Sequence, residues 1–194
     1  MKVIPTIFLL AITLSLHAQL TLTKLTCEYM DNPTVVDETT PHLSWINLAK
    51  PGERGQKQTA YQIRVASTTK KLKSPDLWNS GKILSDQSNR IPYGGVELRS
   101  RMDCFWQVRT WDKAGRVSAW SPVATWRMGL LRESDWIAQW IGAPWQGDEA
   151  MPKPPGGPDA RPQQMPPPAP LLRKQVTIKK KIKKAVVYTT GLEY

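Results

Sequence analysis

The stretch Cys104–Trp126, CFWQVRTWDKAGRVSAWSPVATW, consists of two runs of alternating apolar and polar residues joined by a short polar segment. The joining segment, Asp112–Gly115, has the residue types of a tight turn. Alternation with a period of two is typical of β-strands, and two such runs around a turn predict a β-hairpin. The hairpin holds four of the nine Trp residues of the chain, and we expect the first domain to be built around it.

The alternation divides the first run of the hairpin between two faces of a sheet. Cys104, Trp106, Val108 and Thr110 form the better core face, and Phe105, Gln107, Arg109 and Trp111 form the opposite face. On that opposite face Arg109 can stack against Trp111 or Trp120, a cation–π contact worth roughly 0.5–2 kcal/mol. The alternative is a platform of exposed indole rings that binds the apolar faces of sugars. We predict the structural stack and keep the sugar platform as the alternative.

Shorter runs of the same kind precede the hairpin at regular spacing, with turn residues between them. They are Leu20–Tyr29, His42–Leu48, Gln58–Ser67, Leu77–Gly81 and Ile83–Ile91. In Gln58–Ser67 one face is apolar and the other polar, as in an antiparallel sheet that covers a core. Seven short strands separated by turns predict an all-β fold, an antiparallel β-sandwich that spans residues 19–128.

The first 18 residues have the layout of a secretory signal peptide. Lys2 supplies the positive start, Val3–Leu16 is mostly apolar, and Ala18 is a small residue at the cleavage point. A buried N-terminal helix is the alternative. The apolar run is shorter than the ~20 residues of a transmembrane helix. We therefore predict export to the periplasm or the extracellular space, with no membrane partner after signal removal.

Two further segments follow the predicted sandwich. Residues 129–169 form a linker, in which Trp136 and Trp140 fit either a helical turn or irregular structure. Its Pro-rich insert, Gly147–Pro170, cannot pack a core and is interpreted as an extended surface segment rather than a proline-motif ligand. Residues 170–194 contain two runs with strand character, which we interpret as the first strands of an incomplete second β-sandwich. These runs are Leu171–Ile178 and Lys184–Thr190.

The formal charge is +11, and the lysine cluster Lys179–Lys184 supplies much of it. Such a charge is typical of proteins that bind nucleic acid or anionic surfaces. Because an exported protein rarely meets nucleic acid, we predict no nucleic-acid partner and interpret the cluster as a solvated turn. The two cysteines of the mature chain are Cys27 and Cys104. A disulfide and a pair of buried thiols are both compatible with the sequence.

Side chains that carry out chemistry are scarce. His42 is the only histidine after signal removal, and no Cys/His cluster has metal-ligand spacing. No Gly-rich phosphate loop is present. A glycosidase needs two carboxylates roughly 5–10 Å apart, whereas Asp31, Asp37, Glu38 and Asp112 lie in predicted turns or loops. We therefore predict no catalytic, cofactor-binding or metal-binding residue in this chain, and no cofactor.

The hairpin pattern resembles fibronectin type III-like domains. It reads Trp106-x-Val108-x-Thr110-x-Asp112-x-x-Gly115-x-x-Ser118-x-Trp120-Ser121, with Cys104 where that family usually has a core Tyr. Further stretches extend the resemblance to the N-terminal part of secreted bacterial α-L-rhamnosidases. They are Leu25–Pro33, Pro41–Trp45, Gln58–Ser67, Asp76–Gln87, Ser134–Pro144 and Pro170–Tyr194. Together they cover nearly all of the mature chain except the Pro-rich insert.

The resemblance implies an inverting glycoside hydrolase that releases terminal L-rhamnose. In that family the catalytic glutamates lie in a later (α/α)6 barrel, so no catalytic residue is assigned to this chain. We therefore expect this chain to be a non-catalytic N-terminal fragment that is inactive alone. Its expected partner is the missing catalytic domain of the same polypeptide. A rhamnose-containing glycan is a further candidate partner. The alternative is a stand-alone extracellular β-sandwich that binds carbohydrate or protein.

Overall fold

The computed structural model describes residues 20–49, 51–52, 54–141, 173–182 and 184–191. The chain divides into two units, Met1–Ile137 and Ala138–Tyr194, and each is described by itself. The predicted signal peptide and the Pro-rich insert Gly147–Pro170 lie outside the described residues. Among the helices that the structure describes, none is long and apolar enough to cross a membrane.

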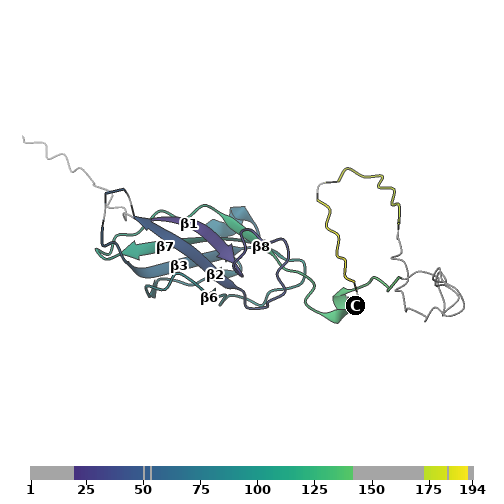
Figure 1. The fold of residues 1–194 in the computed structure, drawn as a ribbon, viewed down its shortest axis with the longest axis horizontal. Helices are drawn as coiled ribbons and strands as arrows, with labels where there is room; N and C mark the ends of the chain where they lie inside the picture. Colours follow the sequence, from purple (N-terminus) through teal and green to yellow (C-terminus); the bar gives the residue numbers. More distant parts are fainter. Residues whose placement is uncertain (1–19, 50, 53, 142–172, 183, 192–194) are drawn as a thin grey trace, which may run out of the picture. The chain divides into compact units, whose positions relative to one another are not determined.

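The first unit is a sandwich of two antiparallel sheets (Figure 1). The smaller sheet has the order β1-β2-β6, formed by β1 (Leu20–Cys27), β2 (His42–Ala49) and β6 (Ile91–Pro92). The larger sheet has the order β4-β3-β7-β8, with β5 also paired to β3. Its strands are β3 (Gln58–Ala66), β4 (Trp78–Asn79), β5 (Ile83–Leu84), β7 (Asp103–Asp112) and β8 (Ala124–Arg127). The all-β sandwich predicted from the sequence is confirmed.

Strand β7 is one of the two interior strands of the larger sheet. It pairs with β3 from Asp112 opposite Gln58 to Phe105 opposite Ala66, and with β8 on its other side. Every second residue of β7 is buried. The predicted core face is confirmed, because Cys104, Trp106, Val108 and Thr110 are all fully buried.

The core lies between the two sheets and is rich in aromatic side chains. Trp45 of β2 contacts Tyr61 of β3 edge-to-face, with ring centroids 5.3 Å apart. Tyr93, just after β6, contacts Trp126 of β8 at 6.0 Å. Such edge-to-face pairs add about 0.5–1.5 kcal/mol each beyond the burial of apolar area. Both contacts bridge the two sheets and stabilise their packing.

Strand β1 contains a bulge that the sequence pattern partly encodes. Leu20 and Leu22 are two residues apart, but the next buried leucine is Leu25. The register with β2 shifts between Thr23 and Thr26, and Lys24 takes a left-handed φ of 46°. The extra residue brings Leu25 back to the core face.

The predicted single strand Ile83–Ile91 is wrong, because the chain changes sheets within it. β5 pairs with β3 in the larger sheet, whereas β6 pairs with β2 in the smaller one. Between them Ser85 N–H donates to Thr59 of β3, and Ser88 accepts from Trp45 N–H of β2. The segment Ile83–Ile91 therefore forms backbone hydrogen bonds first with the larger sheet and then with the smaller one. A 3-10 helix, η1 (Thr69–Lys73), lies between β3 and β4.

A second 3-10 helix, η2 (Glu133–Asp135), follows the sandwich. Residues 136–141 after it are irregular, so of the two alternatives for Trp136 and Trp140 the helical turn does not hold.

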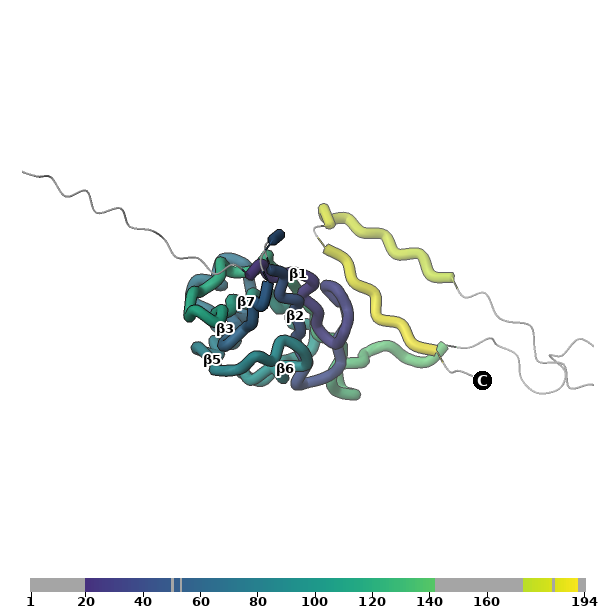
Figure 2. The backbone as a smooth tube through the Cα atoms, turned by 60° about the vertical axis from the view of Figure 1, so that its left-hand side comes forward, coloured from purple at the N-terminus to yellow at the C-terminus, as the bar shows by residue number. Residues whose placement is uncertain are grey.

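The segments Arg173–Ile182 and Lys184–Gly191 of the second unit contain no assigned strand in their described residues. Figure 2 draws both as extended stretches. Two strands alone are marginal in water, and their side chains here are almost all exposed. That they open a second sandwich stays a prediction.

Candidate functional site on the outer face of strand β7

The turn after β7 is held by the carboxylate of Asp112. Its Oδ1 accepts the backbone N–H groups of Ala114 and Arg116, and its Oδ2 accepts the Arg116 Nε–H at 2.8 Å. Gly115, at a φ of 75°, donates its N–H to the Asp112 carbonyl. The predicted turn at Asp112–Gly115 is confirmed, and the role of Asp112 in it is structural.

The second arm of the hairpin pairs with β7 in an unusual way. Only Ala124–Arg127 forms a regular ladder with it. Before that, Ser118 and Ser121 each donate their N–H to a β7 carbonyl and accept, through their hydroxyl, the N–H of the same β7 residue. The residues they bond are Thr110 and Val108. The serine hydroxyls replace strand carbonyls, and Trp120 lies between the two serines in the sequence.

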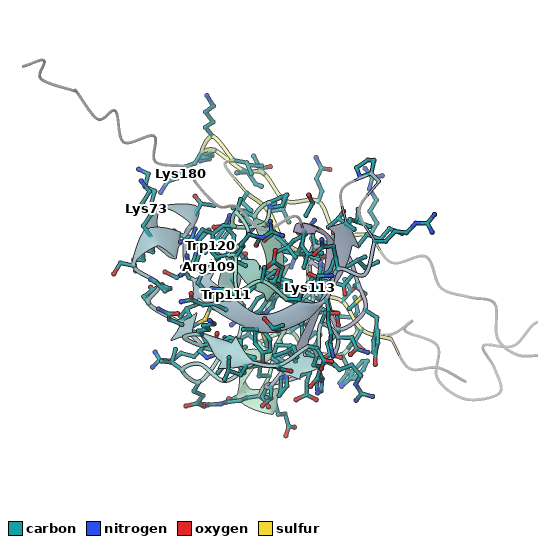
Figure 3. The ribbon with its side chains drawn as sticks, turned by 90° about the vertical axis from the view of Figure 1, so that its left-hand side faces the viewer. Lys73, Arg109, Trp111, Lys113, Trp120 and Lys180 are labelled. Atoms are coloured by element: carbon teal, nitrogen blue, oxygen red, sulfur yellow. The ribbon has the colours of Figure 1, made fainter. Side chains whose placement is uncertain are left out.

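The outer face of the larger sheet carries alternating cationic and indole groups. The Arg64 guanidinium lies 3.9 Å from the centroid of the Trp120 ring. The Arg109 guanidinium lies 4.7 Å from Trp120 and 5.2 Å from Trp111, so it is shared by both rings. Lys82 Nζ lies 4.8 Å from Trp111. We call these five residues the cation–indole ladder, and Figure 3 labels Arg109 with its two Trp neighbours.

Neutral polar side chains fix the two arginines. Gln107 Oε1 accepts bonds from Arg64 Nε and Nη2, at 3.2 and 2.6 Å. Gln62 Oε1 accepts a bond from Arg109 Nε at 2.9 Å. Desolvation, together with repulsion from Arg109, lowers the pKa of Arg64. The two guanidiniums are therefore held close to each other without a carboxylate between them.

This arrangement confirms the predicted stack of Arg109 against Trp111 and Trp120. The sugar platform, which needs a ring face open to the ligand, stays the alternative. Each indole here is approached by two cations. The half-buried position of both rings agrees with a structural role.

The two thiols are buried in the core and free. Burial, and to a smaller degree the negative charge of Glu28, raises the pKa of Cys27 to about 12. Burial and then the neighbouring Cys27 raise the pKa of Cys104 to about 12. Of the two alternatives, the structure shows buried thiols. Neither is a thiolate nucleophile near neutral pH.

His42 is paired with one carboxylate and no nucleophile. Glu28 Oε1 lies 3.0 Å from His42 Nδ1 and accepts the His42 backbone N–H at 2.6 Å. Glu28 belongs to a two-residue turn in which Glu28 and Tyr29 both have positive φ, and backbone bonds join Cys27 to Met30 on either side. The pair fixes this turn against the start of β2.

A polar cleft of about 830 Å³ lies where the chain leaves the sandwich. Its carboxylates, Glu97 and Asp135, both have neighbours. Ser100 and the Arg132 N–H bond Asp135, which lowers its pKa, and Glu97 lies 3.5 Å from Arg132 Nη2. A general acid needs a raised pKa, and the pKa of Asp135 is shifted in the opposite direction. No sequence motif marks this cleft, because its residues come from separate stretches of the chain.

The remaining acidic residues predicted to lie in turns do so. Asp31 accepts from Asn32, and Glu38 accepts the Thr40 N–H. Within the described ranges no three His, Cys, Asp or Glu side chains gather in a way that could hold a metal ion.

The fold and these sites define an immunoglobulin-like β-sandwich whose polar residues hold turns and faces together. Residues 22–132 match the family model described as "Rha78A-like, N-terminal immunoglobulin domain". Because this match covers more than half of the chain, the chain belongs to that family.

Named relatives agree with this assignment. An α-L-rhamnosidase of Streptomyces avermitilis is 47% identical over 118 residues, which cover 60% of this chain and 11% of the relative. One from Alteromonas sp. (strain LOR) is 38% identical over 164 residues, covering 82% of this chain and 16% of the relative. The crystal structure of the S. avermitilis enzyme with L-rhamnose aligns with a TM-score of 0.62 at 43% identity, over 64% of this chain and 12% of that one. The chain therefore spans only a small part of the proteins it matches.

Proposed function

We propose that this chain is the N-terminal part of an α-L-rhamnosidase, in which the sandwich is a non-catalytic scaffold for the catalytic part. The observation that carries the proposal is the 47% identity to a named α-L-rhamnosidase over only 11% of its length. Most of the length of such a protein therefore lies outside this domain and is available for the catalytic part. The partner of the sandwich is then the catalytic domain of the same polypeptide, with a rhamnose-containing glycan as its substrate.

The site geometry supports the non-catalytic role. In the described residues, His42 has a carboxylate neighbour but no nucleophile, both thiols have raised pKa values, and the carboxylates of the cleft are bonded to neighbours. The lowered pKa of Asp135 is the opposite of what the general acid of a glycosidase needs.

The test is rhamnose release from 4-nitrophenyl α-L-rhamnopyranoside. The purified 194-residue chain is expected to release none, whereas a polypeptide encoded by a reading frame that continues past the codon for Tyr194 is expected to be active. Measurable release by the 194-residue chain would refute the scaffold role. A stop codon directly after Tyr194, with no second gene for the remainder, would refute the proposal that it is part of a larger enzyme.

We also propose that the chain is exported. Support comes from the charged, apolar and small-residue layout of residues 1–18. Expression in a bacterial host followed by N-terminal sequencing of the periplasmic fraction tests it. A mature N-terminus near Gln19 is expected, and an intact Met1 in the cytoplasmic fraction would contradict export.

A further inference from the structure

The cation–indole ladder has more positive charge than its structural role requires. An indole can be held by apolar packing alone, yet each of these two has two cations close to its ring centroid. On this face of the sheet the described strands supply one carboxylate, Asp103, which is bonded by Arg127 at 2.7 Å. Arg64, Arg109 and Lys82 have no carboxylate within ion-pair distance in the described part of the chain. The described carboxylates therefore do not neutralise the positive charge of the ladder, and a partner outside the domain can do so.

The arginines also retain hydrogen-bond donors. Arg109 uses its Nε–H on Gln62, and no bond from its two Nη atoms to a described residue is found. Arg64 uses Nε and Nη2 on Gln107, which leaves Nη1. Both side chains are half-buried rather than covered. A guanidinium with free Nη groups forms paired hydrogen bonds with a flat carboxylate, and such charge-assisted bonds are among the strongest in proteins.

The cations follow one line along the sheet. In the β3–β7 register Arg64 is opposite Gln107, Gln62 is opposite Arg109, and Ala60 is opposite Trp111. The ladder therefore runs from Arg64 past Trp120, Arg109 and Trp111 to Lys82, next to the β5 strand that pairs with the same end of β3. A linear partner with regularly spaced negative charges matches a row of this kind.

We propose that the cation–indole ladder is a binding surface for an acidic polysaccharide whose charges are uronate carboxylates. Charge complementarity selects an anionic partner, and the free Nη groups select planar carboxylates. The choice of a glycan rather than an acidic protein rests on the proposed function. Binding occurs at the rims of the guanidiniums and at Lys82, not by stacking of sugars on the indoles, since cations already approach both rings.

The test measures binding of the purified 194-residue chain to immobilised polygalacturonate at low ionic strength, with dextran as the uncharged comparison. Polygalacturonate contains no rhamnose to hydrolyse, so this result is independent of rhamnosidase activity. Binding to polygalacturonate and not to dextran is expected, and it should weaken as salt is raised. Equal binding to both, or to neither, overturns the proposal.

Three variants locate the surface. R64Q/R109Q is expected to weaken binding about tenfold or more, because charge-assisted bonds to two guanidiniums are lost. K82Q, at an exposed position beside Trp111, is expected to leave the sandwich folded and to weaken binding about threefold. The matched control K179Q/K180Q removes two charges from the other basic region of the chain and is expected to leave binding within about twofold.

The control variant K179Q/K180Q can also give a result that contradicts the proposal. If K179Q/K180Q abolishes binding while K82Q does not change it, the lysine cluster is the polyanion site and the proposal is wrong. Circular dichroism of each variant shows whether the sandwich is folded. If R64Q/R109Q fails to fold, K82Q alone decides, and unchanged affinity of K82Q overturns the proposal. Tighter binding to heparin than to polygalacturonate would replace the uronate with a sulfate ester and so contradict it.

Discussion

The two faces of strand β7 hold similar residues by opposite means. On the inner face Trp106 is fully buried among the apolar side chains of both sheets. On the outer face Trp111 is half-buried, and both Arg109 and Lys82 lie close to its ring. A Trp side chain is thus stabilised by loss of water contact on the inner face and by cation stacking on the outer face. The comparison teaches that a Trp-rich strand need not hold a ligand by stacking it on the indole rings. The chemistry of the neighbouring side chains decides.

The largest expected effect is on the inner face. Trp106→Ala should lower the free energy of unfolding by about 3–5 kcal/mol, because it leaves a large cavity in a core that packs from two sheets. Chemical denaturation followed by circular dichroism measures this. Trp106→Phe should cost much less, since it keeps most of the volume and removes a ring N–H that has no hydrogen-bond partner in the described part of the structure. Equal losses for both variants would show that volume is not what Trp106 contributes.

The next effect falls on the one charged residue of the inner face. Asp112→Ala should lower the free energy of unfolding by about 2–3 kcal/mol, because the N–H groups of Ala114 and Arg116 lose their acceptor. Asp112→Asn keeps an oxygen for these groups and should cost about half as much. A measurement in which the two variants are alike would mean that the charge, not the acceptor, holds the turn.

Asp112 also predicts an acid-dependent loss of stability. Burial acts to raise its pKa, but the Arg116 backbone N–H, the Arg116 side chain and the Ala114 N–H outweigh it, so the pKa of Asp112 is lowered on folding. A lowered folded pKa stabilises the native state above the unfolded value of about 4, and this contribution is lost as the pH falls further. The melting temperatures of the wild type and Asp112→Asn should therefore converge as the pH is lowered from about 5 to below about 4. Parallel curves would exclude this role of Asp112.

The outer face is expected to be more tolerant. Trp120→Ala should cost about 1–2 kcal/mol, since it removes the stacking of two guanidiniums on a half-buried ring. The same denaturation experiment as for Trp106→Ala makes this a matched pair of Trp→Ala changes on the two faces. A cost equal to that of Trp106→Ala would show that the ladder is as important to folding as the core.

The smallest effect concerns Thr110 on the inner face. Its hydroxyl is fully buried, and the described structure gives it no partner. Thr110→Val replaces that hydroxyl with a methyl group of similar size and should raise the free energy of unfolding by up to about 1 kcal/mol. Thermal unfolding of the two proteins measures the difference. A clear loss of stability would mean that the hydroxyl is bonded in solution, by a water molecule for instance.

Prediction from the sequence succeeded where the pattern was local. The alternation of β7, the turn at Asp112 and the alternation in β3 depend on neighbouring residues, and each was read correctly. The prediction of a single strand at Ile83–Ile91 is wrong, because the two ends of this segment bond to different sheets. A change of sheet leaves no local pattern in the sequence. The role of Ser118 and Ser121 was also missed. A serine hydroxyl that replaces a strand carbonyl is set by the approach of two segments, not by the spacing of residues.

By itself, the sequence determined the strand periods, the turn chemistry and the family, because these depend on which residues follow one another. Only the tertiary structure decided what the aromatic and charged residues do. It brought Arg64 of β3 and Arg109 of β7 within 3.9 and 4.7 Å of the centroid of Trp120, and it buried both thiols in one core. Contacts between residues far apart in the chain depend on register and sheet order, and those are fixed only when the whole sandwich has formed.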